Sequence, residues 1–132
     1  LPPELLPAAR TTAEMMERIR TTLGAHAGYT VPILISSGYR CPALNLAKGS
    51  SSTSDHPRAQ AVDWTAPGFG TPAQICRALA PLVGVLGIGQ LIYECPEPGR
   101  RWVHVSTKMP TRPANRVITI GPSGPMLGIQ EA

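Results

Sequence analysis

A histidine followed seven residues later by an aspartate, His56 and Asp63, is the pattern that most constrains how this chain can fold. The alternation of apolar and polar residues over 60–65 predicts a β-strand that carries Asp63 between Val62 and Trp64. A carboxylate buried in a strand costs free energy unless it is paired with a cation or binds a metal. The fold must therefore supply Asp63 with a partner.

A second histidine, His104, lies in another strand pattern over 101–107 and completes a set of two imidazoles and one carboxylate. This is the ligand set of a catalytic zinc, which keeps one position open for water, whereas a structural zinc usually has four protein ligands. We therefore expect His56, Asp63 and His104 to bind Zn²⁺. The alternative is a loop histidine at position 56 and a strand-end aspartate that pairs with an arginine. His26, placed in the loop after the first predicted helix, is expected to be structural or solvated.

The length of 132 residues fits one domain over 1–132 that buries roughly two-thirds of its unfolded surface. The 13 glycines and 15 prolines predict many loops, with an irregular arm over 1–10 and a partly ordered Gly/Pro-rich tail over 121–132. No apolar run approaches the ~20 residues of a membrane helix, so we expect no membrane span. The chain begins at Leu1 rather than methionine, which is compatible with removal of a signal peptide.

The formal charge of +4 favours anionic partners, among them nucleic acid, anionic lipid and the bacterial cell wall. Lys and Arg cluster no further than pairs and the chain has a single Phe, so no nucleic-acid partner is expected. The cysteines form no Cys-x-x-Cys pair, which argues against a zinc ribbon. Cys76 is expected to be a small buried hydrophobe, and a Cys41–Cys95 bridge stays open.

Capping signals predict two main helices. Thr11, with Glu14 three residues later, forms a capping-box pattern, and Gly24 is a stop signal. Thr71 as the cap, followed by Pro72 at the first helical position, opens the second helix. The predicted helices are residues 11–23 and 73–85, with one or two further helical turns at 42–48.

Strands are predicted where apolar and β-branched residues lie between turn signals. Pro32 places the first residues of the first strand at an edge. The predicted strands are residues 31–37, 60–65, 90–94, 101–107 and 115–120, with a polar loop at 49–54 and a hairpin connection at 95–100. Two helices with mostly antiparallel strands predict an α+β fold, a small sheet with flanking helices.

The first predicted strand ends in Ser37-Gly38-Tyr39-Arg40, which places a guanidinium at a tight turn. Arginine offers a planar fork of donors that suits a substrate carboxylate or a developing oxyanion. The alternative is an ordinary surface arginine after a glycine turn.

Several motifs follow one another along the chain: Ser37-Gly38-Tyr39-Arg40, Asn45, Ser54-x-His56-x6-Asp63 and Trp102-Val103-His104-Val105-Ser106. In this order and separation they closely resemble the zinc D-alanyl-D-alanine peptidase family. That family includes D,D-carboxypeptidases, D,D-dipeptidases and phage L-alanyl-D-glutamate endopeptidase lysins, and shares its fold with the hedgehog signalling domain. The resemblance covers roughly 34–107, and the motifs are specific only in combination.

The resemblance implies a zinc peptidase that hydrolyses the peptide stems of bacterial peptidoglycan. His56, Asp63 and His104 would be the zinc ligands, and Arg40 would stabilise negative charge on the substrate or transition state. We expect a monomer that acts on the cell wall, in the periplasm or outside the cell, as a phage lysin or a secreted enzyme. The alternative is a non-catalytic zinc-binding or wall-binding domain of the same fold, such as a structural part of a virion. The residues expected to bind substrate are Tyr39, Arg40, Ser54 and Trp102.

Two positions depart from the family pattern. Ala59 stands where glycine is usual, a mild change unless that position needs a positive φ. Arg101 stands where many members carry an acidic general base, three residues before the last histidine. If the chain is an enzyme, its base must come from elsewhere.

Strand parity points to Glu94 as that base. A hairpin turn centred on Pro98 would place Glu94 opposite Trp102, and so on the same face as His104. A register shifted by one residue would turn Glu94 away and favour Glu97. The alternative is that Glu94 is a solvated strand-end residue.

Overall fold

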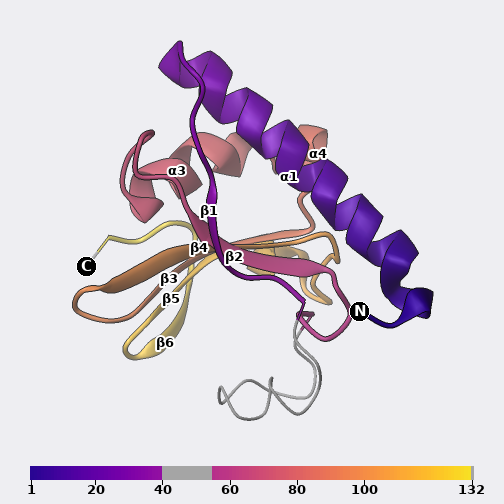
Figure 1. The fold of residues 1–132 in the computed structure, drawn as a ribbon. Helices are drawn as coiled ribbons and strands as arrows, with labels where there is room; N and C mark the ends of the chain where they lie inside the picture. Colours follow the sequence, from indigo (N-terminus) through magenta and orange to yellow (C-terminus); the bar gives the residue numbers. More distant parts are fainter. Residues whose placement is uncertain (40–54, 132) are drawn as a thin grey trace.

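The structure, a computed structural model, describes residues 1–39 and 55–131. Within these ranges six strands form one sheet, in the order β1-β2-β4-β3-β5-β6, and α1, α3 and α4 all lie on one face of it (Figure 1). The α+β prediction is confirmed. None of the helices in this part of the chain is long and apolar enough to cross a membrane. The elements are η1 (Pro3–Leu5), α1 (Leu6–Ala27), β1 (Leu34–Ser37), β2 (Ala61–Thr65), α3 (Pro72–Leu79), η2 (Ala80–Leu82), α4 (Val83–Leu86), β3 (Gln90–Glu97), β4 (Arg100–Ser106), η3 (Pro113–Arg116), β5 (Val117–Gly121) and β6 (Gly124–Leu127).

Alternation along β2 and β4 separates the core from the opposite face of the sheet. Trp64, Val103 and Val105 are fully buried and belong to the core cluster that the helices complete. Asp63, between Val62 and Trp64, and His104, between Val103 and Val105, therefore lie on the face that carries none of the three helices. From the helices, the core receives Met15, Ile19, Leu23, Ile75 and Leu79.

Helix α1 is longer at both ends than the predicted 11–23, and the prediction of an irregular arm over 1–10 is wrong. Thr11 does not cap the helix: its hydroxyl donates to the Pro7 carbonyl, one turn earlier, at 3.1 Å. Pro7 is tolerated because the N–H groups of the first turn have no partner within a helix. Gly28, with φ 82°, ends the helix about one turn later than expected.

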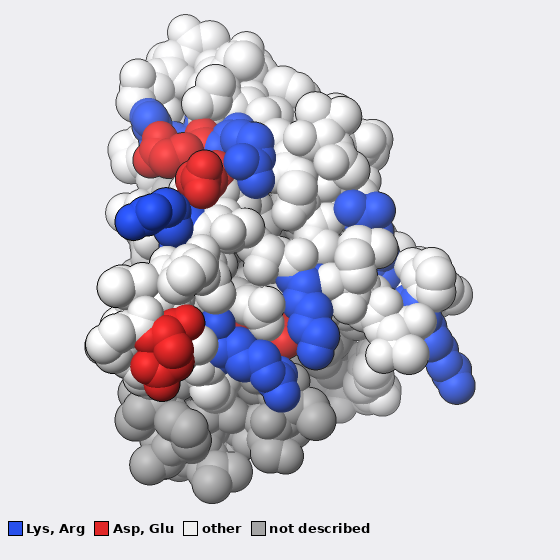
Figure 2. Space-filling view, turned by 90° about the vertical axis from the view of Figure 1, so that its right-hand side faces the viewer, with Lys and Arg blue, Asp and Glu red and all other residues white. Residues whose placement is uncertain are grey.

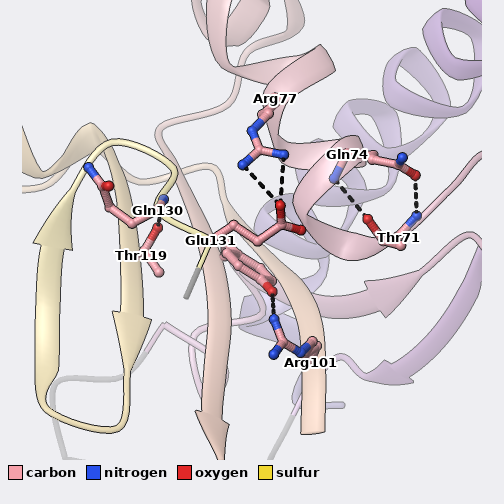
Figure 3. Close-up of polar contacts among 8 residues, drawn as sticks. Thr71, Gln74, Arg77, Arg101, Thr119, Gln130 and Glu131 are labelled. Carbon is pink, nitrogen blue, oxygen red and sulfur yellow. Dashed lines mark hydrogen bonds and ion pairs between the residues drawn. The ribbon is translucent and has the colours of Figure 1, made fainter. Parts of the chain in front are cut away.

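The second predicted helix, 73–85, begins as expected but is divided into α3, η2 and α4. Thr71 and Gln74 form a capping box in which each side chain bonds the other's backbone N–H (Figure 3). Pro81 explains the division, because it has no N–H to give to the preceding turn and its ring crowds that turn.

The strands agree with the prediction except at their ends and in the tail. β1 begins at Leu34 rather than at residue 31, and β5 begins at Val117 after η3. The pairing is antiparallel except between β3 and β5, which run parallel. The tail, expected to be only partly ordered, contains β6, which pairs with β5. The helical turns predicted at 42–48 and the loop at 49–54 lie outside the described residues.

The last residues of the tail are fixed against the sheet and α3 (Figure 3). Thr119 donates its hydroxyl to the Gly128 carbonyl at 2.8 Å and accepts the backbone N–H of Gln130 at 2.8 Å. Arg77 of α3 forms an ion pair with Glu131 at 3.4 Å. These contacts explain why a segment rich in turn residues is ordered.

Cys76 and Cys95 are free and buried. Burial raises the pKa of the Cys76 thiol to about 12, so it is a small apolar core residue, as predicted. Among the described residues Cys95 is a free thiol, and the bridge left open between Cys41 and Cys95 involves Cys41, which lies outside them.

Candidate metal centre

The sheet register brings two of the three predicted ligands together. Asp63 on β2 lies directly opposite His104 on β4 in an antiparallel pair. His56 comes from the loop that precedes β2. One potential ligand atom from each of the three residues lies within 4.8 Å of the others, so the cluster could hold a metal ion.

Asp63 sits between the two histidines and contacts one with each carboxylate oxygen. Its Oδ1 is 2.9 Å from His104 Nδ1, and its Oδ2 is 3.3 Å from His56 Nε2. The two imidazole rings meet edge to face, with centroids 5.3 Å apart. Two nitrogen donors and one carboxylate are thus already gathered around one point.

The tautomer of His56 follows from its second contact. Its Nδ1 lies 2.8 Å from the Gly38 carbonyl oxygen, which can only accept, so Nδ1 carries the hydrogen. Nε2 is therefore the nitrogen that faces the cluster, 3.3 Å from Asp63 Oδ2, where it could ligate a metal. Hydrogen bonds of this kind orient the histidine ligands of metal sites.

Electrostatics keep Asp63 ionised. Burial of Asp63 acts to raise its pKa, but hydrogen bonds from His104 and His56, together with their charge interactions, outweigh burial and hold the pKa well below its ordinary value. At neutral pH the cluster thus contains one anionic oxygen donor.

The loop that carries His56 is held by residues that sequence reasoning did not select. Asp55 accepts a hydrogen bond from Ser106 on β4 at 2.8 Å, and its carbonyl accepts the N–H of Gln60 at 3.1 Å. Thr12 of α1 donates to the Ala59 carbonyl at 2.7 Å. In the sequence, the position of the Asp55 carboxylate directly before His56 was the signal that pointed to this role.

Ala59 has φ 56°, in the left-handed region that favours glycine, and its side chain is buried. The substitution of the family's usual glycine is therefore not mild. A left-handed non-glycine residue costs roughly 1–2 kcal/mol, which the loop's other contacts must offset.

The observed register of the β3/β4 hairpin is the one that favours Glu94 over Glu97 as the general base. Glu94 lies opposite Trp102 and Ile92 opposite His104, so Glu94 and His104 are diagonal neighbours on one face. Glu94 Oε1 is 3.9 Å from His104 Nδ1. Glu97, the alternative, lies past an irregularity in the pairing and forms an ion pair with Arg100 at 3.0 Å.

Arg101 belongs to the other face of the sheet. Its guanidinium donates to the hydroxyl of Tyr93, the partner of buried Val103 on the helix side (Figure 3). The residue that replaces the family's usual acid therefore does not enter the cluster. Trp102 does share the face of His104, with the Arg100 guanidinium 5.6 Å from its ring centroid.

The remaining predicted site residues lie at or beyond the edge of the described part. Tyr39 is half-buried and is the last residue described before the gap. Arg40 and Ser54 lie outside the described residues. His26 lies in the last turn of α1 rather than in a loop, and it is not a member of the metal cluster.

Comparison with known proteins agrees with the resemblance seen in the motifs. No curated protein matches the chain. The family model for peptidase M15 matches residues 4–106, which include all three residues of the cluster and Glu94. The chain therefore belongs to the peptidase M15 family.

Proposed function

We propose that this chain is a zinc peptidase that hydrolyses the peptide stems of bacterial peptidoglycan. The observation that carries the proposal is the convergence of His56, Asp63 and His104 in a chain of the M15 family. The donor set fits zinc: two imidazole nitrogens and one ionised carboxylate are three ligands of a catalytic site, with room for a fourth. Bound there, zinc would activate a water molecule and polarise the scissile carbonyl.

The chain's own residues would supply the rest of the chemistry. Glu94, which lies on the same face as His104, would accept the water proton and pass it to the leaving amine. Gly38 would hold the His56 imidazole in its ligating orientation. Arg40 and Ser54 are proposed to bind the substrate, with Tyr39 and Trp102 lining its path.

The site supports an enzyme better than a non-catalytic zinc-binding or wall-binding domain. That alternative depended on Arg101 replacing the usual acid, but Arg101 contacts Tyr93 on the helix face. A carboxylate, Glu94, is present on the correct face. We propose that the protein acts on the cell wall as a monomer, as a phage lysin or a secreted enzyme.

Digestion of purified sacculi tests the proposal. With zinc added, the wild-type protein should release soluble muropeptides, and the His104→Ala variant and a chelated sample should not. Mass spectrometry of the released fragments would identify the bond that is cut. Absence of release from sacculi of several wall chemistries, by a zinc-loaded protein, would favour the non-catalytic domain.

A further inference from the structure

Basic side chains are numerous on one side of the molecule. In Figure 2, Lys and Arg lie across the whole view, and toward its right they have no acidic side chain beside them. Independently of that view, backbone and side-chain contacts connect the segments that carry four basic residues, which we name the basic face: Arg58, Lys108, Arg112 and Arg116.

Ser106, at the end of β4, connects two members of the basic face. Its hydroxyl donates to Asp55 at 2.8 Å, and Asp55 forms an ion pair of 3.5 Å with Arg58. The same hydroxyl accepts the backbone N–H of Lys108 at 3.1 Å. One serine thus bonds both the backbone of Lys108 and the carboxylate that pairs with Arg58, 50 residues away in the chain.

Arg116 is held close to this point by the turn before β3. Its guanidinium donates twice to the Ile88 carbonyl, at 3.2 and 2.8 Å. The next residue, Gly89, donates its N–H to the Ser106 carbonyl at 2.8 Å and packs against the backbone of Lys108. Arg112 lies one turn from Arg116, at the start of η3.

Little negative charge offsets these cations locally. Residues 107–116 contain Lys108, Arg112 and Arg116 but no Asp or Glu. Asp55, the acidic residue of this contact network, is already engaged by Ser106 and Arg58. Lys108 and Arg112 are exposed, so their charges face solvent. Such a surface attracts anions over about 10 Å at moderate salt.

The basic face adjoins the metal centre. Asp55 directly precedes His56, and Ser106 lies two residues beyond His104 on the same side of β4. The basic face therefore lies beside the loop and the strand that carry two of the three cluster residues, His56 and His104.

We propose that the basic face binds the carboxylates of neighbouring peptide stems in the same sacculus and so holds the insoluble polymer against the site. The identity of the polymer rests on the proposed function. Each stem carries free carboxylates, and guanidinium and ammonium groups are their natural partners. The face thus favours cross-linked wall over soluble fragments.

Binding to purified sacculi tests the inference, in a chelating buffer that suppresses hydrolysis. The Lys108→Gln/Arg112→Gln double variant should bind about tenfold or more weakly, the scale for removing two cations from an anionic surface. The matched control is Arg20→Gln/Arg77→Gln, which removes the same charge from residues paired with Glu17 and Glu131 elsewhere. Its affinity should change less than about twofold, and circular dichroism checks that both variants fold.

Chemically treated sacculi identify the anion. Conversion of the carboxylates to amides should abolish the difference in sacculus affinity between the wild type and the double variant. Removal of phosphate polymers with hydrofluoric acid should leave that difference unchanged. Equal losses in both double variants, loss only on phosphate removal, or tighter binding to duplex DNA would each overturn the inference. If the protein hydrolyses sacculi but does not bind them through this face, the inference is overturned and the proposed function stands. If it binds them through carboxylates but does not hydrolyse them, the inference stands and the proposed function is overturned.

Discussion

Single side chains determine whether this site can hold a metal. Asp63 contacts His104 at 2.9 Å and His56 at 3.3 Å, so loss of either imidazole removes one of three prearranged donors. We expect about one zinc per wild-type chain, as a three-ligand catalytic site implies, and substantial loss of zinc in His56→Ala and in His104→Ala. Metal analysis after dialysis measures the content. His26→Ala is the control, and full zinc retention in both ligand variants would refute the assignment.

The role of Glu94 can be tested separately from that of the metal ligands by a substitution that preserves the shape of its side chain. Glu94→Gln removes the proton acceptor but keeps its size, so zinc content and fold should be unchanged while sacculus hydrolysis falls about 10²–10⁴-fold. Glu97→Gln is the matched control, because Glu97 pairs with Arg100 in the turn. If Glu94→Gln digests sacculi at the wild-type rate and Glu97→Gln does not, the roles are reversed.

The backbone conformation of Ala59 leads to a prediction about the free energy of unfolding. Because φ is 56°, Ala59→Gly relieves strain, although the greater freedom of glycine in the unfolded chain offsets part of the gain. We expect a net change between zero and about 1 kcal/mol in favour of folding, measured by urea denaturation. A β-branched residue is far less compatible with this conformation, so Ala59→Val should destabilise by more than about 1 kcal/mol. Equal stability of the two variants would contradict the argument.

At the scale of elements, the features predicted correctly are those that short-range interactions along the chain determine. The Thr71 cap and the β3/β4 register follow from short-range rules of capping and turn geometry, and both are as predicted. The extension of α1 before Thr11 was missed because Thr11 and Glu14 look like a capping box, whereas the Thr11 hydroxyl bonds the Pro7 carbonyl inside the helix. The residues that extend the helix, 6–10, are exposed or half-buried. Strand β6 was missed because its pairing partner, β5, is what orders it.

The turn between α4 and β3 has no space for a side chain at Gly89. A Cβ at Gly89 would lie 2.4 Å from the carbonyl carbon of Lys108, a backbone atom that cannot move aside easily. Gly89→Ala should therefore destabilise by about 2 kcal/mol or more, as overpacking does. Gly84, in α4, has open space around it, and Gly84→Ala should be neutral or stabilise by up to about 1 kcal/mol. Thermal denaturation measures both, and similar melting temperatures would contradict the predicted contact.

At the scale of the molecule, core and candidate site occupy opposite faces of one sheet. Spacing alone could suggest His56 and Asp63 as partners, but His104 is 41 residues beyond Asp63, and only the pairing of β2 with β4 brings them together. The strand pattern around His104 and the ligand set that it completes predicted the third ligand, and the family resemblance implied the same set. Asp55 directly precedes His56 in the sequence, but its role depends on Ser106 of β4 lying beside it, which only the fold shows.

This separation predicts how the protein responds to loss of metal. The core between the helices and the sheet includes none of the three cluster residues, so the metal-free chain should stay folded. Zinc that binds only the native state adds stability, about 2.7 kcal/mol at a free concentration 100 times the dissociation constant. Chelation should therefore lower the melting temperature by roughly 5–10 °C while the far-ultraviolet circular dichroism at 20–25 °C is kept, and added zinc should restore it. In His104→Ala the melting temperature should respond little to zinc. Unfolding on chelation, or an equal zinc response in this variant, would show that the metal is bound elsewhere or is required for the core.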